Sequence, residues 1–466
     1  MLFYGPLMLF PFLTRGIPDV PAGVVGFFRP FFATFLFVAL YRWRLPIDDS
    51  FIAGDDALRF DWIVWLIDQP GLVSRLELAL FALLVLFAIG LFTRIVYPLC
   101  ALGFTLWVLV LVQSGTNVHE WEVCVLTVLC LVPVRWGAAL SLDALIRRRL
   151  PEAEAGSREL HGKQFGYAIW MPGFILGAVW LGAAVSKIQI SGVEWILGGA
   201  VKYHWVIDSP QAAAPDLALW IASHHWASVL MSFMGVVLEA TFITASFVRT
   251  TLARSLLGAG IGGALVAGFY TFHGVLWWTW ALVLVSFVVP WAALYRLVTK
   301  KPLRPLPAPA TPVIGPRRAQ VAMMVVVCLL MVRQWPEGIG RFTSYSNTYQ
   351  SIEDFERRNP VKPTNRVFIG YGSLSSREVF QGSNQVDLVV ESITTLQRGL
   401  PLPESHAAEF PEMAQRLATS YGDDRGLVTW VEEKRAFDWE RGEFAVASER
   451  PIATINLRTA SLATTY

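Results

Sequence analysis

The chain has 466 residues and a nearly balanced charge of +2, from 38 basic and 36 acidic side chains. Only 16% of the residues are charged, against about 25% in ordinary soluble domains. Hydrophobic residues make up 54%, with 19 Trp and 30 Phe among them. This composition excludes an ordinary soluble protein and indicates lipid as the natural solvent. Without a basic arm or a zinc-finger spacing, the charge balance gives no basis for a nucleic-acid partner.

The four cysteines, Cys100, Cys124, Cys130 and Cys328, all lie in apolar stretches and form no CxxC pair. Their placement predicts small apolar packing residues rather than disulfides or a redox pair. No His, Cys, Asp or Glu spacing in the chain is typical of a metal site, so no metal is predicted.

Residues 1–23 are apolar, with no positive charge before the apolar run and no small-residue cleavage site. This pattern predicts a short interfacial segment rather than a signal peptide. Beyond it, nine apolar runs approach the roughly 17–25 residues that a membrane-spanning helix needs. They are residues 23–41, 76–92, 96–113, 120–133, 166–185, 228–247, 256–270, 274–294 and 320–332. The fourth, seventh and ninth are short, so eight or ten spans remain open alternatives.

The distribution of Lys and Arg predicts the orientation of these spans. With the N-terminus in the cytoplasm, the cytoplasmic loops carry sixteen basic residues, against six in the opposite loops before the C-terminal domain. We therefore expect an integral protein of the inner (cell) membrane, with a cytoplasmic N-terminus. Five histidines then gather near the extracytoplasmic ends of spans: His119, His204, His224, His225 and His273. A functional cluster and a chance gathering of interfacial aromatic residues both remain open.

The predicted organisation is a transmembrane domain at 24–300, a Pro-rich cytoplasmic linker at 301–318, a last transmembrane helix at 319–333 and an extracytoplasmic domain at 334–466. The linker includes KPLRPLPAPATPVIGP, a composition typical of an extended chain. In the last domain, strands are predicted at 366–371, 386–396, 426–431, 444–447 and 452–457, and one amphipathic helix at 406–421. The predicted fold class is mainly α: a polytopic helical membrane bundle with a small C-terminal β-rich or α+β domain.

Ionisable groups inside spans are costly and usually have a partner or a function. Arg29 in GFFRPFFATF can snorkel to the interface, or satisfy a backbone carbonyl or a carboxylate. Asn117 and His119 belong to the polar turn QSGTNVHEWE, where turn chemistry and an acid–base or ligand role are both open. His273 stands at another short outer turn.

Lys187 ends a strongly apolar run and is followed by a segment with Gly and Trp. It is either an interfacial anchor or a buried lysine whose neutral amine serves as a base. Glu239 lies in the middle of GVVLEATFI and must face a neighbouring span or a water-filled cavity.

Taken in order, these motifs resemble the vitamin K-dependent γ-carboxylase family and its wider bacterial relatives, the HTTM-domain membrane proteins. The resemblance covers residues 24–295. It lies in Arg29 of the first span, the Asn117/His119 pair, the run AAVSKIQISGVEWILGG, the acidic span position Glu239 and the turn Phe272–His273. The domain at 334–466 does not match the large lumenal domain of the animal carboxylases.

The resemblance implies an enzyme that couples oxygenation of a hydroquinone to carboxylation of a glutamate or a related substrate. It implies reduced vitamin K or another hydroquinone as cofactor, with O₂ and CO₂. Lys187 would be the base, with His119 and Asn117 as further catalytic residues. The predicted cofactor-binding residues are Trp195, His273, Glu239 and Arg29. The expected partners are membrane lipid, a lipid-soluble quinone and a protein or peptide substrate at the extracytoplasmic face.

Two other functions remain open. One is a non-catalytic membrane scaffold or maturation partner that binds another protein through the C-terminal domain. The other is a transporter of protons or small solutes that uses Glu239 and Lys187. Transport usually needs access from both faces, and the candidate residues gather on one side, which argues against it.

Overall fold

A computed structural model describes residues 14–42, 61–67, 69–113, 118–148, 161–209, 212–248, 250–299, 316, 318–332, 352, 367–370, 377–379, 427–456 and 461–465. These residues are mostly helical. The chain divides into two compact units. Unit 1 is Met1–Pro215 with Trp226–Thr348, and unit 2 is Asp216–His225 with Tyr349–Tyr466.

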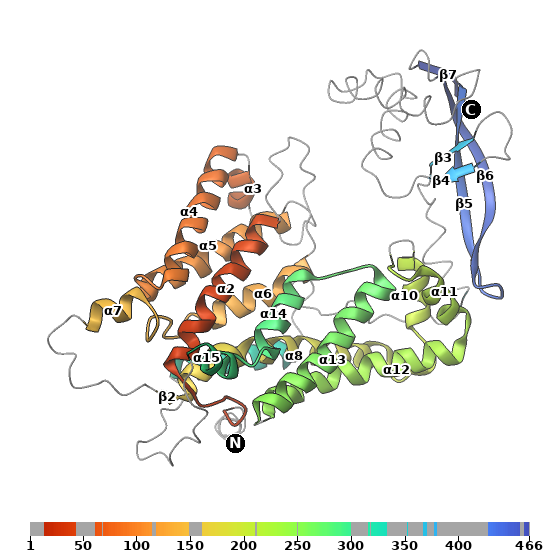
Figure 1. Cartoon of the computed structure of the whole chain (residues 1–466). Helices are drawn as coiled ribbons and strands as arrows, with labels where there is room; N and C mark the ends of the chain where they lie inside the picture. The colour runs from red at the N-terminus through yellow and green to blue at the C-terminus, as the bar shows by residue number, and fades with distance from the viewer. Residues whose placement is uncertain are drawn as a thin grey trace. The chain divides into compact units, whose positions relative to one another are not determined.

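Unit 1 contains helices at every predicted apolar run (Figure 1). The long ones are α2 (Ala22–Arg42), α4 (Pro70–Ile89), α5 (Thr93–Gln113), α6 (Val118–Cys130), α8 (Lys163–Ser191), α12 (His225–Phe242) continued by η4 (Ile243–Phe247), α13 (Thr251–His273), α14 (Trp278–Val288), α15 (Trp291–Thr299) and α16 (Arg318–Val332). Shorter helices are α3 (Asp61–Ile67), α7 (Leu142–Arg148), α9 (Glu194–Leu197) and α10 (Val201–Asp208).

Six of the described helices are long and apolar enough to cross a membrane, and the bent pair α14–α15 raises the number to seven. Helices α6 and α16 are apolar but shorter, at 13 and 15 residues. The chain is therefore a mainly helical protein with the composition of a membrane protein. The count of nine spans stays a prediction.

The predicted span 274–294 is wrong as a single helix. Gly274 adopts the left-handed conformation (φ 66°) that ends α13, and α14 begins only at Trp278. A second break before Trp291 bends α14 and α15 by 62°. Pro290 lies in this break and cannot donate the backbone hydrogen bond that would continue α14.

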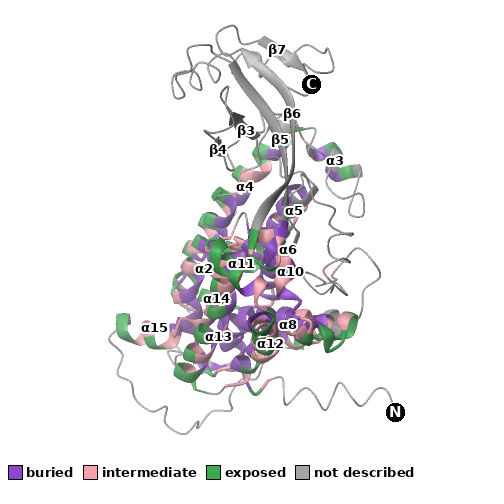
Figure 2. Ribbon diagram, turned by 90° about the vertical axis from the view of Figure 1, so that its right-hand side faces the viewer, coloured by how far each residue is buried: buried purple, intermediate pink, exposed green. Residues whose placement is uncertain are grey.

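Helix α8 lies at the centre of unit 1 and is almost continuously buried over its first 18 residues (Figure 2). Two glycines permit this close packing. A Cβ on Gly173 would clash with the ring of Phe287 in α14, and one on Gly177 would meet the backbone of Ile243 in η4. The apolar side chains around α8 belong to one large hydrophobic core that also includes α2, α5, α6 and α14.

One end of unit 1 is held together by the residues before α2. Strand β1 (Val20–Pro21) pairs antiparallel with β2 (His161–Gly162), which directly precedes α8. Lys163 Nζ donates to Thr14 O at 2.8 Å, and Arg254 of α13 donates to Gly16 O at 2.6 Å. The starts of α2, α8 and α13 therefore lie at the same end of unit 1.

Unit 2 contains α11 (Pro215–Ser223) over most of its length, and an antiparallel five-stranded sheet in the order β4-β3-β5-β6-β7. The strands are β3 (Val367–Gly370), β4 (Arg377–Val379), β5 (Leu427–Asp438), β6 (Glu443–Asn456) and β7 (Ser461–Thr465). β6 runs through both strands predicted at 444–447 and 452–457, and its register shifts against β5 next to Trp430. The predicted strand 386–396 and helix 406–421 lie outside the described residues, and a separate extracytoplasmic domain stays a prediction.

Candidate functional site

The site begins with Lys187, which lies inside α8 and not after it. The predicted span ended at residue 185, but α8 continues to Ser191 and is closed by Gly192. Gly192 has φ 63°, a backbone conformation that favours glycine. The extra turns carry Lys187 into the protein interior, where it is only 4% exposed.

Lys187 forms a buried ion pair with Glu239 of α12. Its Nζ lies 2.7 Å from Oε1 and 2.6 Å from Oε2, and Glu239 is also 4% exposed. Two charges removed from water are tolerated only with close, well-oriented partners. The Lys187–Glu239 contact meets that requirement, and it identifies the partner that the mid-span glutamate needs.

Trp195 packs over the ammonium group of Lys187. Its ring centroid lies 5.3 Å from Lys187 Nζ, within the range of a cation–π interaction. The indole is 2% exposed and is carried by α9, a four-residue helix between Gly192 and Gly199. Both glycines have positive φ, which lets the chain reverse and place Trp195 over the end of α8. The structure thus brings together three residues that were predicted for the site: Lys187, Glu239 and Trp195.

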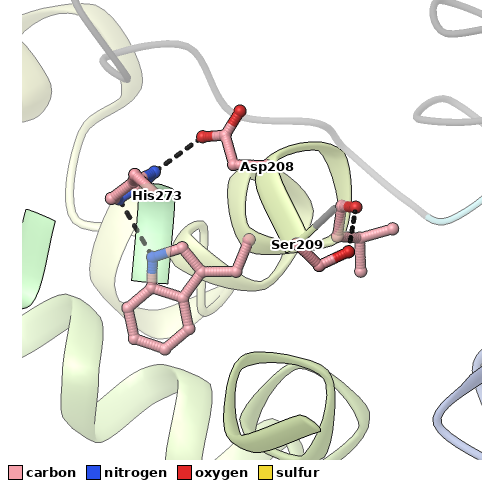
Figure 3. Close-up of polar contacts among 5 residues, drawn as sticks. Asp208, Ser209 and His273 are labelled. Carbon is pink, nitrogen blue, oxygen red and sulfur yellow. Dashed lines mark hydrogen bonds and ion pairs between the residues drawn. The ribbon is translucent and has the colours of Figure 1, made fainter. Parts of the chain in front are cut away.

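The partners of His273 include a carboxylate and an indole (Figure 3). Its Nδ1 is 2.6 Å from Oδ2 of Asp208, and its Nε2 accepts a hydrogen bond of 3.0 Å from Trp205 Nε1. Glu239 interacts electrostatically with His273. Ser209, also drawn in Figure 3, donates instead to Val206 O, so these residues do not form a Ser-His-Asp triad.

The surface beside Lys187 is apolar and open. After residue 180, α8 loses its cover of neighbouring helices, and large apolar side chains become exposed. Val185, Ile188 and Ile190 of α8, with Val193 and Leu197 around α9, are exposed by 37–61%. Apolar side chains of this kind face lipid in a membrane protein. Lys187 therefore lies in a stretch of α8 whose neighbouring apolar side chains are exposed.

The remaining predicted residues are not part of this group. Arg29 donates hydrogen bonds to Ala88 O, Trp136 O and Leu140 O, at the end of the bundle where α8 begins. It does not snorkel, because these three carbonyls hold its guanidinium in the interior, where Asp143 also interacts with it electrostatically. Asn117 lies outside the described residues, and His119 is described only as a backbone position in α6.

Sequence reasoning missed Asp208 and Trp205. Both lie in α10, whose segment VKYHWVID shows no motif. Asp208 is separated from His273 by 65 positions along the chain, so only the packing of α10 against α13 brings them together. On the same short helix, burial lowers the pKa of Lys202. The described residues include no group of three His, Cys, Asp or Glu side chains that could hold a metal.

Comparison with models of protein families, with curated proteins and with solved structures finds no match to this chain.

Proposed function

We propose that the chain is an integral membrane enzyme in which Lys187, paired with Glu239, acts as a base toward a lipid-soluble hydroquinone. The observation that carries the proposal is the buried contact of 2.6 Å between Lys187 Nζ and Glu239 Oε2 beside an open apolar surface. A buried amine with one carboxylate partner can present a neutral nitrogen when the shared proton sits on the carboxylate. This is the property that a base in a dry site needs.

The residues around Lys187 fit a hydroquinone in three respects. The exposed side chains of Val185 and Ile188 offer an apolar entrance. The Trp195 indole, only 2% exposed, forms an aromatic wall over the amine. Lys187 itself supplies an acceptor for a hydroxyl proton. A bound hydroquinone would supply the two electrons that the resemblance couples to carboxylation, with O₂ and CO₂ as co-substrates.

In this proposal each residue has one task. The Lys187 amine accepts the proton of a bound hydroxyl, and the Glu239 carboxylate holds the amine in place and shares the proton. The Trp195 ring excludes water from one side of the amine, which keeps the site dry and its electrostatic interactions strong. The carboxylated substrate, a glutamate side chain or a related acid, would approach from the extracytoplasmic side.

The proposal includes the orientation of the chain: nine spans, with the N-terminus in the cytoplasm. Six exposed Trp and Tyr side chains of unit 1 support it, namely Tyr41, Trp62, Trp65, Trp226, Tyr270 and Trp278. All six lie at helix ends on the side that the count of basic residues assigns to the exterior. Trp and Tyr are enriched at membrane–water interfaces. The exposed aromatic residues thus mark one membrane interface, and it is the one opposite the interface where the basic residues gather.

The test is epoxidation of a hydroquinone by the purified protein in nanodiscs, supplied with oxygen and either reduced vitamin K or reduced menaquinone. We expect epoxide from the wild type and none from Lys187→Arg, which keeps the positive charge but cannot act as a base at neutral pH. Lys202→Ala is the matched control, since it removes a half-buried lysine of the neighbouring helix α10 and should keep the activity.

No epoxide from folded wild-type protein with either quinone would contradict the proposal. The non-catalytic scaffold would then be the better interpretation, and the domain predicted at 334–466 would be the place to look for a protein partner. Epoxide that persists in Lys187→Arg would keep the enzyme but remove Lys187 from the role of base.

A further inference from the structure

Helix α12 has one face turned outward and one turned toward the rest of unit 1. The side chains on its outer face are large, apolar and exposed: Leu230, Phe233, Met234 and Val237. Ser232 and Glu239 are buried and lie on the opposite face. Gly235 belongs to this inner row, because it stands three residues after Ser232 and four before Glu239, the spacing that places residues on one face of a helix.

The inner face of α12 has an open space at Gly235. A Cβ added to this glycine would have no atom of the described residues within 4 Å. Two other glycines that face the interior have no such room. A Cβ on Gly262 of α13 would lie 2.6 Å from Leu284, and one on Gly177 of α8 would lie 2.8 Å from Ile243. The packing around α12 therefore leaves a gap where its inner row passes Gly235.

Contacts on both sides of Gly235 define the ends of this gap. At one end, Lys187 Nζ and Glu239 Oε2, 2.6 Å apart, connect α8 to α12. At the other end, Val201 N at the start of α10 donates to Ser232 Oγ at 3.3 Å. The positions of Ser232 and Glu239 differ by about 10 Å along the helix axis, at roughly 1.5 Å per residue. The gap thus has room for a ring between two polar groups.

Both ends of the gap carry groups that can bind an oxygen of a ligand. At one end is the Lys187 amine, with the Trp195 ring centroid 5.3 Å from its Nζ. At the other end, the Ser232 hydroxyl accepts the bond from Val201, and its own hydrogen has no acceptor among the described residues. Ser232 is 0% exposed, and a buried hydroxyl of this kind usually has a partner for its hydrogen. Between the two ends, the inner row of α12 presents only a glycine.

We propose that the gap at Gly235 is the slot that holds the aromatic ring of the hydroquinone, with one oxygen toward Lys187 and the other toward Ser232. The inference rests on the proposed function and deepens it, because it names the residue that limits the size of the substrate ring. Gly235 determines specificity by having no side chain, since any larger residue at this position would occupy the space of the ring.

The first test measures binding and needs no turnover. A short-tailed, tritiated menaquinone is titrated onto the full-length protein in nanodiscs, and the uptake by empty nanodiscs is subtracted. We expect saturable binding by the wild type and a loss of affinity of about tenfold or more in Gly235→Leu, because the added methylenes and the ring cannot share the slot. Gly260→Leu is the matched control, since this exposed glycine of α13 also has nothing within 4 Å of an added Cβ.

The second measurement separates a change of slot size from general damage. A one-ring quinone of the ubiquinone type needs less of the slot than the two-ring menaquinone. Gly235→Leu should therefore shift the ratio of the two affinities toward the one-ring quinone, whereas a damaged site would weaken both equally. The melting temperature of the ligand-free Gly235→Leu protein should equal or exceed that of the wild type, because leucine is the better helix former and its Cβ meets no neighbour.

Two results would overturn the slot. One is a folded Gly235→Leu protein that binds menaquinone as tightly as the wild type. The other is the absence of saturable binding of either quinone by the folded wild type.

Turnover distinguishes failure of the slot from failure of the proposed function. Binding that depends on Gly235, without any epoxide, would keep the slot and contradict the role of Lys187 as a base. Epoxide that is lost in Lys187→Arg but unchanged in Gly235→Leu would keep the base and contradict the slot.

Discussion

At the residue scale, the main feature of the protein is the ion pair of Lys187 and Glu239, each of which is 4% exposed. Such a pair is not evidence of high stability, because the loss of hydration offsets much of the attraction. Its value lies in holding a titratable amine in a dry interior. A helix-to-helix contact between two apolar side chains would have served packing equally well, and the proposed role of Lys187 as a base accounts for the charges.

The first prediction concerns the stability of this pair. Lys187→Met and Glu239→Leu should each lower the free energy of unfolding by about 3–5 kcal/mol, because each leaves the other charge buried without a partner. The double variant should lose much less than the sum. Thermal unfolding of the four proteins in nanodiscs gives the coupling energy of the double-mutant cycle. Additive losses in the double variant would show that the two side chains do not interact in the membrane.

At the element scale, the ends of helices depend on contacts from distant segments. Asp143 of α7 accepts hydrogen bonds from the backbone N–H groups of Phe92 and Thr93 at 2.7 and 2.9 Å, and so caps the start of α5. The Thr93 hydroxyl adds a third bond at 2.7 Å. Burial raises the pKa of Asp143, but these hydrogen bonds outweigh it and leave the pKa below its usual value of 3.8.

The second prediction is the pH dependence of this cap. A carboxyl whose pKa is lower in the folded state stabilises it fully above the unfolded-state pKa, and the stabilisation is lost as the pH falls through the folded-state value. The wild type should therefore unfold at a higher temperature than Asp143→Asn at pH 7, and the difference should begin to shrink as the pH falls below about 3.8, toward the lower folded-state pKa. A difference that does not change between pH 7 and pH 3 would contradict the role of the charge.

The third prediction concerns the packing of α8. Gly173→Ala should cost about 1–3 kcal/mol, because its Cβ would clash with the Phe287 ring and must displace it. Gly263→Ala is the matched control, since this helical glycine of α13 has nothing within 4 Å of an added Cβ. Alanine should be neutral or slightly stabilising at Gly263. Equal melting temperatures for the two variants would show that α8 and α14 do not pack as closely as described.

At the scale of the whole molecule, the two ends of the helix bundle in unit 1 differ from each other. The starts of α2, α8 and α13 meet the segment 14–21 at one end, and α16 joins them through a hydrogen bond of 3.0 Å from Gln320 to Gln164 O. The pair Lys187–Glu239 and its neighbours α9 and α10 belong to the later part of α8. The site therefore lies toward the end of α8 that is opposite the starts of α2, α8 and α13.

The fourth prediction tests the orientation. In a variant with the four native cysteines replaced by alanine, single cysteines are introduced at Leu145 in α7 and at Ala213 before α11, both exposed. In intact cells, a membrane-impermeant maleimide should label Ala213→Cys and should label Leu145→Cys only after the cells are opened. The reverse pattern would invert the proposed topology, and labelling of both sites in intact cells would exclude an odd number of spans between them.

The sequence by itself determined which segments are apolar helices and which of the loops between them are rich in basic residues, because hydrophobicity and charge are properties of local composition. It also marked Lys187, Glu239 and Trp195 as unusual. It did not determine that α14 begins late or that α8 passes beyond Lys187, since helix ends depend on glycine conformation and on packing.

Only the tertiary structure decided the partners. Lys187 and Glu239 are 52 positions apart, and Asp208 and His273 are 65 apart. The same packing assigned Arg29 to three backbone carbonyls rather than to the site. The physical reason is that a buried polar group must be satisfied by whatever the helix packing brings within hydrogen-bond distance. That distance is determined by the crossing of helices, which no local pattern in the sequence encodes.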